Sequence, residues 1–290
     1  MKNKKLTFIG LGVMGYPMAG HLKKNNYDVT VYNRTKSKSD KWINEYNGYS
    51  KSSPGEASTN SDIIFICVGR DSDLREVMEG DKGIINNIKE NSIIVDHTTA
   101  SADIAREYYD KCKKMNVHFL DAPVSGGQAG AENGKLSIMI GGDEKPFESI
   151  KTVLSSYGKA IELIGESGSG QLTKMINQIC IAGLVQGLSE AMAFGKKSNI
   201  DMEKVLKVIS KGAAQSWQME NRYRTMLNGE FNFGFAVDWM RKDLSICFEE
   251  AKKNGSNLPI TKIIDEYYAK IQSKGGNRYD TSSLMTLVDN

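Results

Sequence analysis

The sequence predicts an α/β domain with a doubly wound, mostly parallel sheet, followed by an all-α domain that a long helix joins to it. Two observations support this prediction. Short apolar runs alternate with amphipathic stretches over the first 165 residues. From about residue 169 the strand pattern disappears, and apolar residues recur with helical period instead. We therefore expect the first domain at residues 1–165 and the second at residues 166–290.

Each expected strand is a short apolar run, which is typical of strands buried on both faces of a sheet. Helix-start signals lie between the runs, as where Ser53 and Pro54 precede Glu56, or where Ser101 precedes an amphipathic stretch that ends near Met115. Another helix is expected near residues 146–156. This alternation predicts βαβ units and a parallel sheet. The expected strands are residues 6–9, 29–32, 63–68, 92–96, 117–121, 136–140 and 161–164.

The second half has the apolar spacing of helices. One helix of roughly 25 to 30 residues is expected from the run between Leu172 and Phe194, long enough to link two domains. Glycines at positions 212, 229 and 255 separate the stretches that follow. The further helices are expected at residues 202–211, 217–227, 237–253 and 259–273.

Composition excludes several classes of protein. With 40% apolar residues in 290, the chain can bury a large core without disulfides or metals. A net charge of +3 is too small to indicate a nucleic-acid partner. The longest charge-free stretches fall short of a membrane span, so we expect no membrane partner.

The histidines lack metal-ligand spacing, and no metal site is expected. Four widely spaced cysteines without a CxxC pair indicate reduced thiols in the cytoplasm: Cys67, Cys112, Cys180 and Cys247.

A glycine-rich motif follows the first expected strand and opens a helix. Gly10 permits the sharp turn, Gly12 lets a pyrophosphate approach the backbone, and Gly15 lets the helix pack closely on the strand. Phosphates would then bind the N–H groups at the helix N-terminus. A purely structural turn is the alternative, but the context of strand, motif and helix favours dinucleotide binding. The motif comprises Gly10, Leu11, Gly12, Val13, Met14 and Gly15.

The end of the second strand indicates which dinucleotide binds. An NAD enzyme usually has Asp or Glu there, about 20 residues after the glycines, whereas this chain has Asn33, Arg34 and Thr35. Without a carboxylate there is no repulsion of a 2′-phosphate, and Arg34 can pair with one. A solvated basic face is the alternative. We favour NADP, with NAD as a possible substitute.

Three later motifs carry a resemblance to a known family. They are Asp121-Ala-Pro-Val-Ser-Gly-Gly127, Gly168-Ser-Gly170 and Lys174-Met-Ile-Asn177. Together with the glycine motif, and in this order, they make the chain similar to the β-hydroxyacid dehydrogenases, including 3-hydroxyisobutyrate dehydrogenase and tartronate semialdehyde and glyoxylate/succinic semialdehyde reductases. The resemblance extends from the first strand to about Asp243, and more loosely to the C-terminus. It implies a Rossmann domain, a long interdomain helix and a helical second domain.

The resemblance implies a catalytic role for Lys174. Reducing an aldehyde beside a carboxylate needs a hydride donor, an acid for the developing alkoxide and an anchor for the carboxylate. The family's matching lysine exchanges the proton with the reacting oxygen. The alternative for Lys174 is an exposed helical lysine with no role in chemistry.

The resemblance also implies residues that bind the substrate. Its matching segment holds the carboxylate through a hydroxyl and main-chain N–H groups, and glycines suit such a close approach. An ordinary turn is the alternative. Many members have a second Asn where this chain has Gln178, which leaves the substrate more open than the reaction. The implied substrate-binding residues are Ser125, Gly126, Gly127, Asn177, Gln178 and Phe235.

Further cofactor contacts are expected where strands end. Val68 and Gly69 follow one strand and Thr99 another, at the edge where ligands of open α/β sheets bind. Thr99 matches a cofactor-binding threonine of the family. Lys242 matches a lysine that reaches the cofactor from the helical domain, with a surface charge pair to Asp243 as the alternative.

These observations predict an NAD(P)-dependent oxidoreductase that interconverts a small 3-hydroxy acid and its semialdehyde, of the 3-hydroxyisobutyrate type. Tartronate, glyoxylate or succinic semialdehyde reduction is the alternative. An imine reductase or a non-catalytic dinucleotide-binding scaffold fits less well, because both would be expected to lack Lys174. The expected partner is a small carboxylate-bearing aldehyde or hydroxy acid, and we expect a homodimer or homotetramer.

Overall fold

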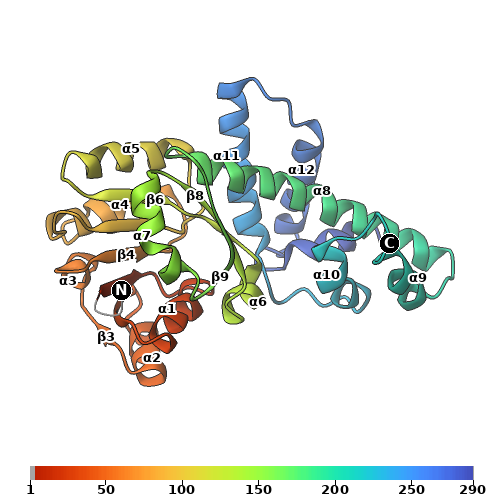
Figure 1. Ribbon diagram of the computed structural model, residues 1–290. Coiled ribbons are helices and arrows are strands. Elements are labelled where there is room, and N and C mark those ends of the chain that lie inside the picture. Colours follow the sequence, from red (N-terminus) through yellow and green to blue (C-terminus); the bar gives the residue numbers. More distant parts are fainter. Residues whose placement is uncertain (1–3, 290) are drawn as a thin grey trace. The chain divides into compact units, whose positions relative to one another are not determined.

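The computed structural model describes residues 4–289 (Figure 1). Contacts divide the chain into two compact units, Met1–Lys174 and Met175–Asn290, and each is described separately. The domain boundary expected after residue 165 remains a prediction, because the helix that follows contributes residues to both units.

The first unit contains a nine-stranded sheet in the order β3-β2-β1-β4-β5-β6-β8-β7, with β9 beside β8. Every pairing is parallel except those of β8 with β6 and with β7. The chain moves outward from β1 to β2 and β3, and returns to the other side of β1 with β4. This reversal confirms the doubly wound topology. The strands are β1 (Lys5–Ile9), β2 (Asp28–Tyr32), β3 (Tyr49–Ser50), β4 (Ile63–Ile66), β5 (Ile93–Asp96), β6 (His118–Asp121), β7 (Val124–Ser125), β8 (Leu136–Gly141) and β9 (Gly158–Gly165).

The strands in the middle of this sheet are buried on both faces, which explains their continuous apolar runs. All of β4 is buried, and its side chains alternate between two cores. Ile63 and Phe65 join one core with Val29 and Trp42, while Ile64 and Ile66 join the other. The helices of this unit are α1 (Gly15–Lys24), α2 (Lys36–Tyr46), α3 (Pro54–Ser58), α4 (Asp71–Glu79), α5 (Ala102–Lys113), α6 (Gly127–Glu132) and α7 (Glu144–Leu154), with a 3-10 turn at Ile84–Asn86.

Helices make up the second unit, as predicted. The long helix α8 (Ser169–Lys197) has 29 residues. It is followed by α9 (Met202–Ile209), α10 (Trp217–Leu227), α11 (Val237–Asn254), α12 (Pro259–Ser273) and a 3-10 segment, Thr281–Leu287. Within residues 4–289, no helix combines the length and apolar character needed to cross a bilayer.

Some local predictions were wrong. The strand expected at residues 63–68 ends at Ile66, because residues 67–70 form the loop that leads into α4. The last expected strand, at 161–164, is longer and starts at Gly158. The helix expected at residues 202–211 ends at Ile209.

Candidate active site

Two of the three motif glycines, Gly10 and Gly15, have no room for a side chain, and the third, Gly12, is open. Gly10 has φ +96°, and a Cβ there would lie 2.2 Å from the carbonyl oxygen of Cys67. A Cβ on Gly15 would lie 2.0 Å from the carbonyl oxygen of Gly10. At Gly12 an added Cβ would meet no atom within 4 Å. The backbone is therefore tightly packed on both sides of Gly12 and open at Gly12 itself.

The N-terminus of α1 suits an anion. The N-cap residue, Met14, makes no side-chain capping hydrogen bond, and the first turn contains no acidic residue. By contrast, Ser53 and Ser101 cap α3 and α5 through their side chains. The first N–H groups of a helix have no partner within it, and the helix dipole favours negative charge there. The glycine motif thus fits the pyrophosphate of a dinucleotide.

The two residues that follow β2 differ in their surroundings: the side chain of Asn33 bonds to the backbone, whereas that of Arg34 is exposed. Asn33 accepts a hydrogen bond from the N–H of Leu11 through Oδ1, and its Nδ2 donates to the carbonyl oxygen of Thr35. The Arg34 side chain is 88% exposed, and its Nη1 lies 3.9 Å from Oδ1 of Asp73. At that exposure the pair is weak, so Arg34 can turn to another anion.

Hydrogen bonds join the loops after β4 and β5. The N–H of Val68 donates to Oγ1 of Thr98 over 3.1 Å. Three residues further along each loop, Asp71 accepts hydrogen bonds from both the N–H and the hydroxyl of Ser101, at 3.0 and 2.6 Å. Ser101 is the N-cap of α5 and Asp71 is the first residue of α4. The two expected cofactor loops are thus held as one assembly.

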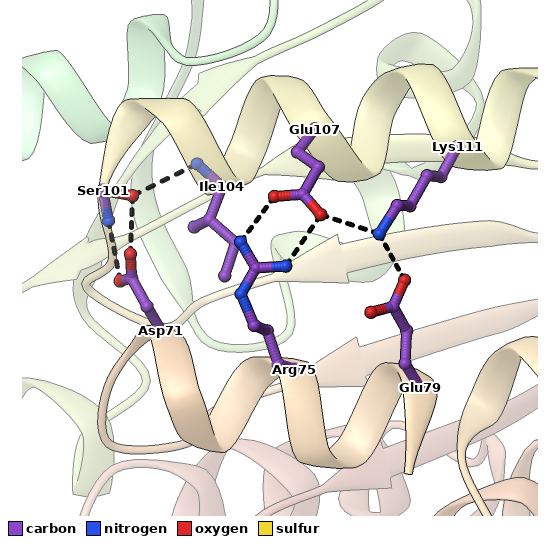
Figure 2. Close-up of polar contacts among 7 residues, drawn as sticks. All are labelled: Asp71, Arg75, Glu79, Ser101, Ile104, Glu107 and Lys111. Carbon is purple, nitrogen blue, oxygen red and sulfur yellow. Dashed lines mark hydrogen bonds and ion pairs between the residues drawn. The ribbon is translucent and has the colours of Figure 1, made fainter.

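Ion pairs extend this link along α4 and α5 (Figure 2). Arg75 makes a bidentate pair with Glu107, at 2.7 and 2.5 Å, and Lys111 contacts both Glu107 and Glu79. Hydrogen bonding to Arg75 is the main reason that the pKa of Glu107 falls to about 2, with Lys111 contributing. The network links the two helices that follow these loops.

Buried carboxylates lie at the ends of β5 and β6. The Oδ1 atom of Asp96 accepts a hydrogen bond from the N–H of Thr98. Burial raises the pKa of Asp96 to about 7, and the charge of neighbouring Asp121 adds to this. The second carboxylate, Asp121, accepts hydrogen bonds from the N–H groups of Gly168 and Gln171, at the start of α8. Sequence reasoning quoted Asp121 only as part of a motif and overlooked Gln171.

The Ser-Gly-Gly segment forms the short strand β7 and the turn into α6. Gly126 and Gly127 have φ values of +132° and +61°. An added Cβ at Gly127 would meet no atom within 4 Å. Ser125 precedes them and is half-buried. The backbone here is open to close approach by a small anion.

Lys174 is buried, with 7% of its surface exposed. It is the last residue of the first unit and lies in the second turn of α8. Lysine is rarely buried in proteins unless its ammonium group is paired. Lys174 is therefore not an exposed helical lysine, and its catalytic role stays a prediction.

In the second unit, hydrogen bonds and an ion pair connect three of the expected site residues to Asp243, which was not an expected site residue. Asn177 donates to Oε1 of Gln178 over 2.7 Å, and Nε2 of Gln178 donates to Oδ2 of Asp243 over 2.6 Å. The ammonium of Lys242 lies 2.7 Å from the other oxygen of Asp243. The charge pair between Lys242 and Asp243 is therefore present, but it is buried rather than at the surface, since the two side chains are only 14% and 2% exposed.

Phe235 is positioned separately in this unit. Its N–H donates to Oδ2 of Asp280, a buried carboxylate that also pairs with Arg222. Among the described residues, no group of three His, Cys, Asp or Glu side chains is arranged to hold a metal ion.

Two protein-family models match most of the chain. Residues 5–165 match the NAD binding domain of 6-phosphogluconate dehydrogenase. Residues 168–288 match the model described as NAD-binding of NADP-dependent 3-hydroxyisobutyrate dehydrogenase.

Individual proteins are similar over nearly the full length. An uncharacterized oxidoreductase of Shewanella frigidimarina is 56% identical, with 98% of each chain covered. The 2-hydroxy-3-oxopropionate reductase of Escherichia coli is 34% identical, covering 98% of this chain and 97% of the relative. The crystal structure of 3-hydroxyisobutyrate dehydrogenase from Salmonella typhimurium is 25% identical and superposes with a TM-score of 0.87, covering 98% of this chain and 100% of that one.

Proposed function

Because this chain belongs to the β-hydroxyacid dehydrogenase family of NAD(P)-dependent oxidoreductases, we propose that it interconverts a small 3-hydroxy acid and its semialdehyde, with Lys174 as the acid and base. The burial of Lys174 is the observation that carries this proposal. A 3-hydroxyisobutyrate-type substrate is favoured, since a matching family model and a similar solved structure carry that name. The E. coli relative supports tartronate semialdehyde as the second candidate.

The roles of the residues follow from their chemistry. A bound nicotinamide dinucleotide supplies hydride for reduction or accepts it for oxidation. The Lys174 ammonium donates a proton to the oxygen of the forming alcohol, and the neutral amine takes it back in the reverse direction. The Ser125 hydroxyl and the N–H groups of Gly126 and Gly127 bind the substrate carboxylate. Asn177 orients the substrate from α8, while Gln178 and Phe235 shape its surroundings.

We propose NADP as the preferred cofactor. Arg34 is an exposed cation after β2, and Asn33 stands where a carboxylate would repel a 2′-phosphate. The residues proposed to hold the dinucleotide are Gly10, Leu11, Gly12, Val13, Met14, Gly15, Asn33, Arg34, Thr35, Val68, Gly69, Thr99 and Lys242.

The test is a substrate panel, monitored by absorbance of the reduced nicotinamide. The panel contains methylmalonate semialdehyde, tartronate semialdehyde, succinic semialdehyde, glyoxylate and a cyclic imine, each with NADPH and with NADH. We expect the highest kcat/KM for methylmalonate semialdehyde, which is the oxidised form of 3-hydroxyisobutyrate, and the next highest for tartronate semialdehyde. Reduction of the imine alone would make the chain an imine reductase. Dinucleotide binding without any turnover would indicate a scaffold.

A further inference from the structure

Gln171 connects the first turn of α8 to the loop that follows β5. Its side chain is fully buried. The Oε1 atom accepts a hydrogen bond from the N–H of Ala100 over 3.0 Å, and Nε2 donates to the carbonyl oxygen of Thr98 over 2.7 Å. One amide therefore bonds the backbone on both sides of Thr99, using its donor and its acceptor together.

The backbone of the same helical turn is anchored independently. Asp121, at the end of β6, accepts hydrogen bonds from the N–H groups of Gly168 and Gln171 at 2.8 and 2.9 Å. A Cβ on Gly170 would lie 2.8 Å from Oδ2 of Asp121, so a glycine is required for this close approach. The start of α8 is thus held against β6 by its main chain and against the β5 loop by Gln171.

The β5 loop is itself anchored by hydrogen bonds on its other side. Thr98 accepts a hydrogen bond from the N–H of Val68 through its hydroxyl, and Ser101 bonds to Asp71, as Figure 2 shows. The Gln171 amide is therefore a side-chain link between a loop and a helix that are each anchored by further hydrogen bonds. A change in this link would shift one relative to the other.

We propose that Gln171 is a positioning residue for catalysis, which sets the place of Lys174 relative to the Thr99 loop. Lys174 follows Gln171 by three residues, so the two side chains lie nearly one helical turn apart on α8. A displacement of about 1 Å in a catalytic group can lower the rate by about 10²-fold. The inference rests on the proposed roles of Lys174 and Thr99.

The first experiment compares Gln171→Met with Gln186→Met. Methionine keeps the length of the side chain and removes both hydrogen bonds. Gln186 lies on the same helix, is also buried, and donates to Glu190 over 2.7 Å. We expect kcat of Gln171→Met to fall about tenfold or more at saturating substrate, while the Kd for NADPH changes less. Gln186→Met should keep wild-type kcat. A folded Gln171→Met protein with wild-type kcat would overturn the inference.

A second variant decides the matter even if Gln171→Met does not fold. In Gln171→Glu, the protonated carboxyl can both donate to Thr98 and accept from Ala100, whereas the ionised carboxylate cannot donate. Burial raises the pKa of such a carboxyl group. We therefore expect kcat of Gln171→Glu, divided by that of the wild type, to rise as the pH falls. A ratio that does not depend on pH would contradict a positioning role.

A double-mutant cycle separates this inference from the proposed function. If Gln171 acts through Lys174, Gln171→Met should cause no further loss of the residual activity of Lys174→Met. Equal fractional losses in both backgrounds would overturn the inference alone. If Lys174→Met by itself keeps wild-type kcat, the proposed role of Lys174 fails, whatever Gln171 does.

Discussion

The side chain of Asn33 accepts a hydrogen bond of 2.9 Å from the N–H of Leu11 and so ties the end of β2 to the glycine loop after β1. Its amide nitrogen also donates to Thr35, which is the N-cap of α2. Arg34 lies between these two anchored points with its side chain exposed. The backbone around Arg34 is therefore fixed, while its guanidinium group is accessible to a ligand.

This arrangement predicts a preference for NADPH over NADH. A hydrogen bond to a charged group contributes about 1.5 to 3 kcal/mol, or roughly 10- to 150-fold in kcat/KM. We expect the lower end, because Arg34 is 88% exposed. The double variant Asn33→Asp, Arg34→Ile should reverse the preference, since Asp can still accept from Leu11 and repels a 2′-phosphate. Lys159→Ala, which removes a positive charge from exposed β9, should leave the ratio unchanged. A wild type that uses NADH equally well contradicts the NADP assignment.

The second prediction concerns Lys174. Methionine at this buried position removes the proton donor and fills the space with an unbranched apolar side chain. We therefore expect kcat to fall by about 10²-fold or more. Binding of NADPH, measured by fluorescence titration, should change little. The control is Lys207→Met, at an exposed position of α9, for which wild-type kinetics are expected. If Lys174→Met retains more than about a tenth of wild-type kcat, Lys174 is not the acid.

The third prediction concerns the substrate carboxylate. If Ser125 and the following glycines bind it, Ser125→Ala should raise KM for a semialdehyde acid by about tenfold, the cost of one charge-assisted hydrogen bond. A neutral aldehyde of the same size should be a poor substrate for both proteins, with no difference between them. Ser155→Ala, an exposed serine after α7, is the control. Equal kcat/KM for the acid and the neutral aldehyde in the wild type would exclude carboxylate binding here.

Elements with strong periodic patterns were predictable from the sequence, and very short ones were not. The run at residues 63–66 is buried on both faces and therefore reads as a continuous apolar strand. The strands Tyr49–Ser50 and Val124–Ser125 have two residues each, too few to show alternation. Helix α6 contains two glycines in six residues, a composition that is unfavourable for helices.

In the candidate site, too, some residues were predictable from the sequence and others were not. The glycine motif and the residues after β2 have a characteristic spacing, so sequence alone indicated them. Gln171 and Asp243 gave no such signal. Gln171 acquires its partners, Thr98 and Ala100, from more than 70 residues away, and Asp243 meets Gln178 65 residues away. Such contacts depend on how strands and helices pack, which a local pattern does not contain.

The last prediction concerns the stability provided by the ion pairs between α4 and α5 in Figure 2. Glu107→Gln removes the charge that pairs with Arg75 and Lys111. The Glu107 side chain is 33% exposed and that of Arg75 is 47% exposed, so solvent weakens the pair. We expect the free energy of unfolding at about pH 7, measured by urea denaturation, to fall by no more than about 1 kcal/mol.

The stabilisation that the charge of Glu107 provides should depend on pH. The pKa of Glu107 is lowered from 4.5 to about 2, chiefly by Arg75, so its contribution is fully present above about pH 4.5. It is lost as the pH falls toward about 2, because the folded protein must then bind the proton. The gap in unfolding free energy between the wild type and Glu107→Gln should therefore shrink between about pH 4.5 and pH 2. Glu148→Gln, whose carboxylate lies 3.4 Å from Lys151 on the exposed face of α7, should show almost no gap at either pH. A gap for Glu107→Gln that stays constant over this range would mean that the charge of Glu107 does not stabilise the fold.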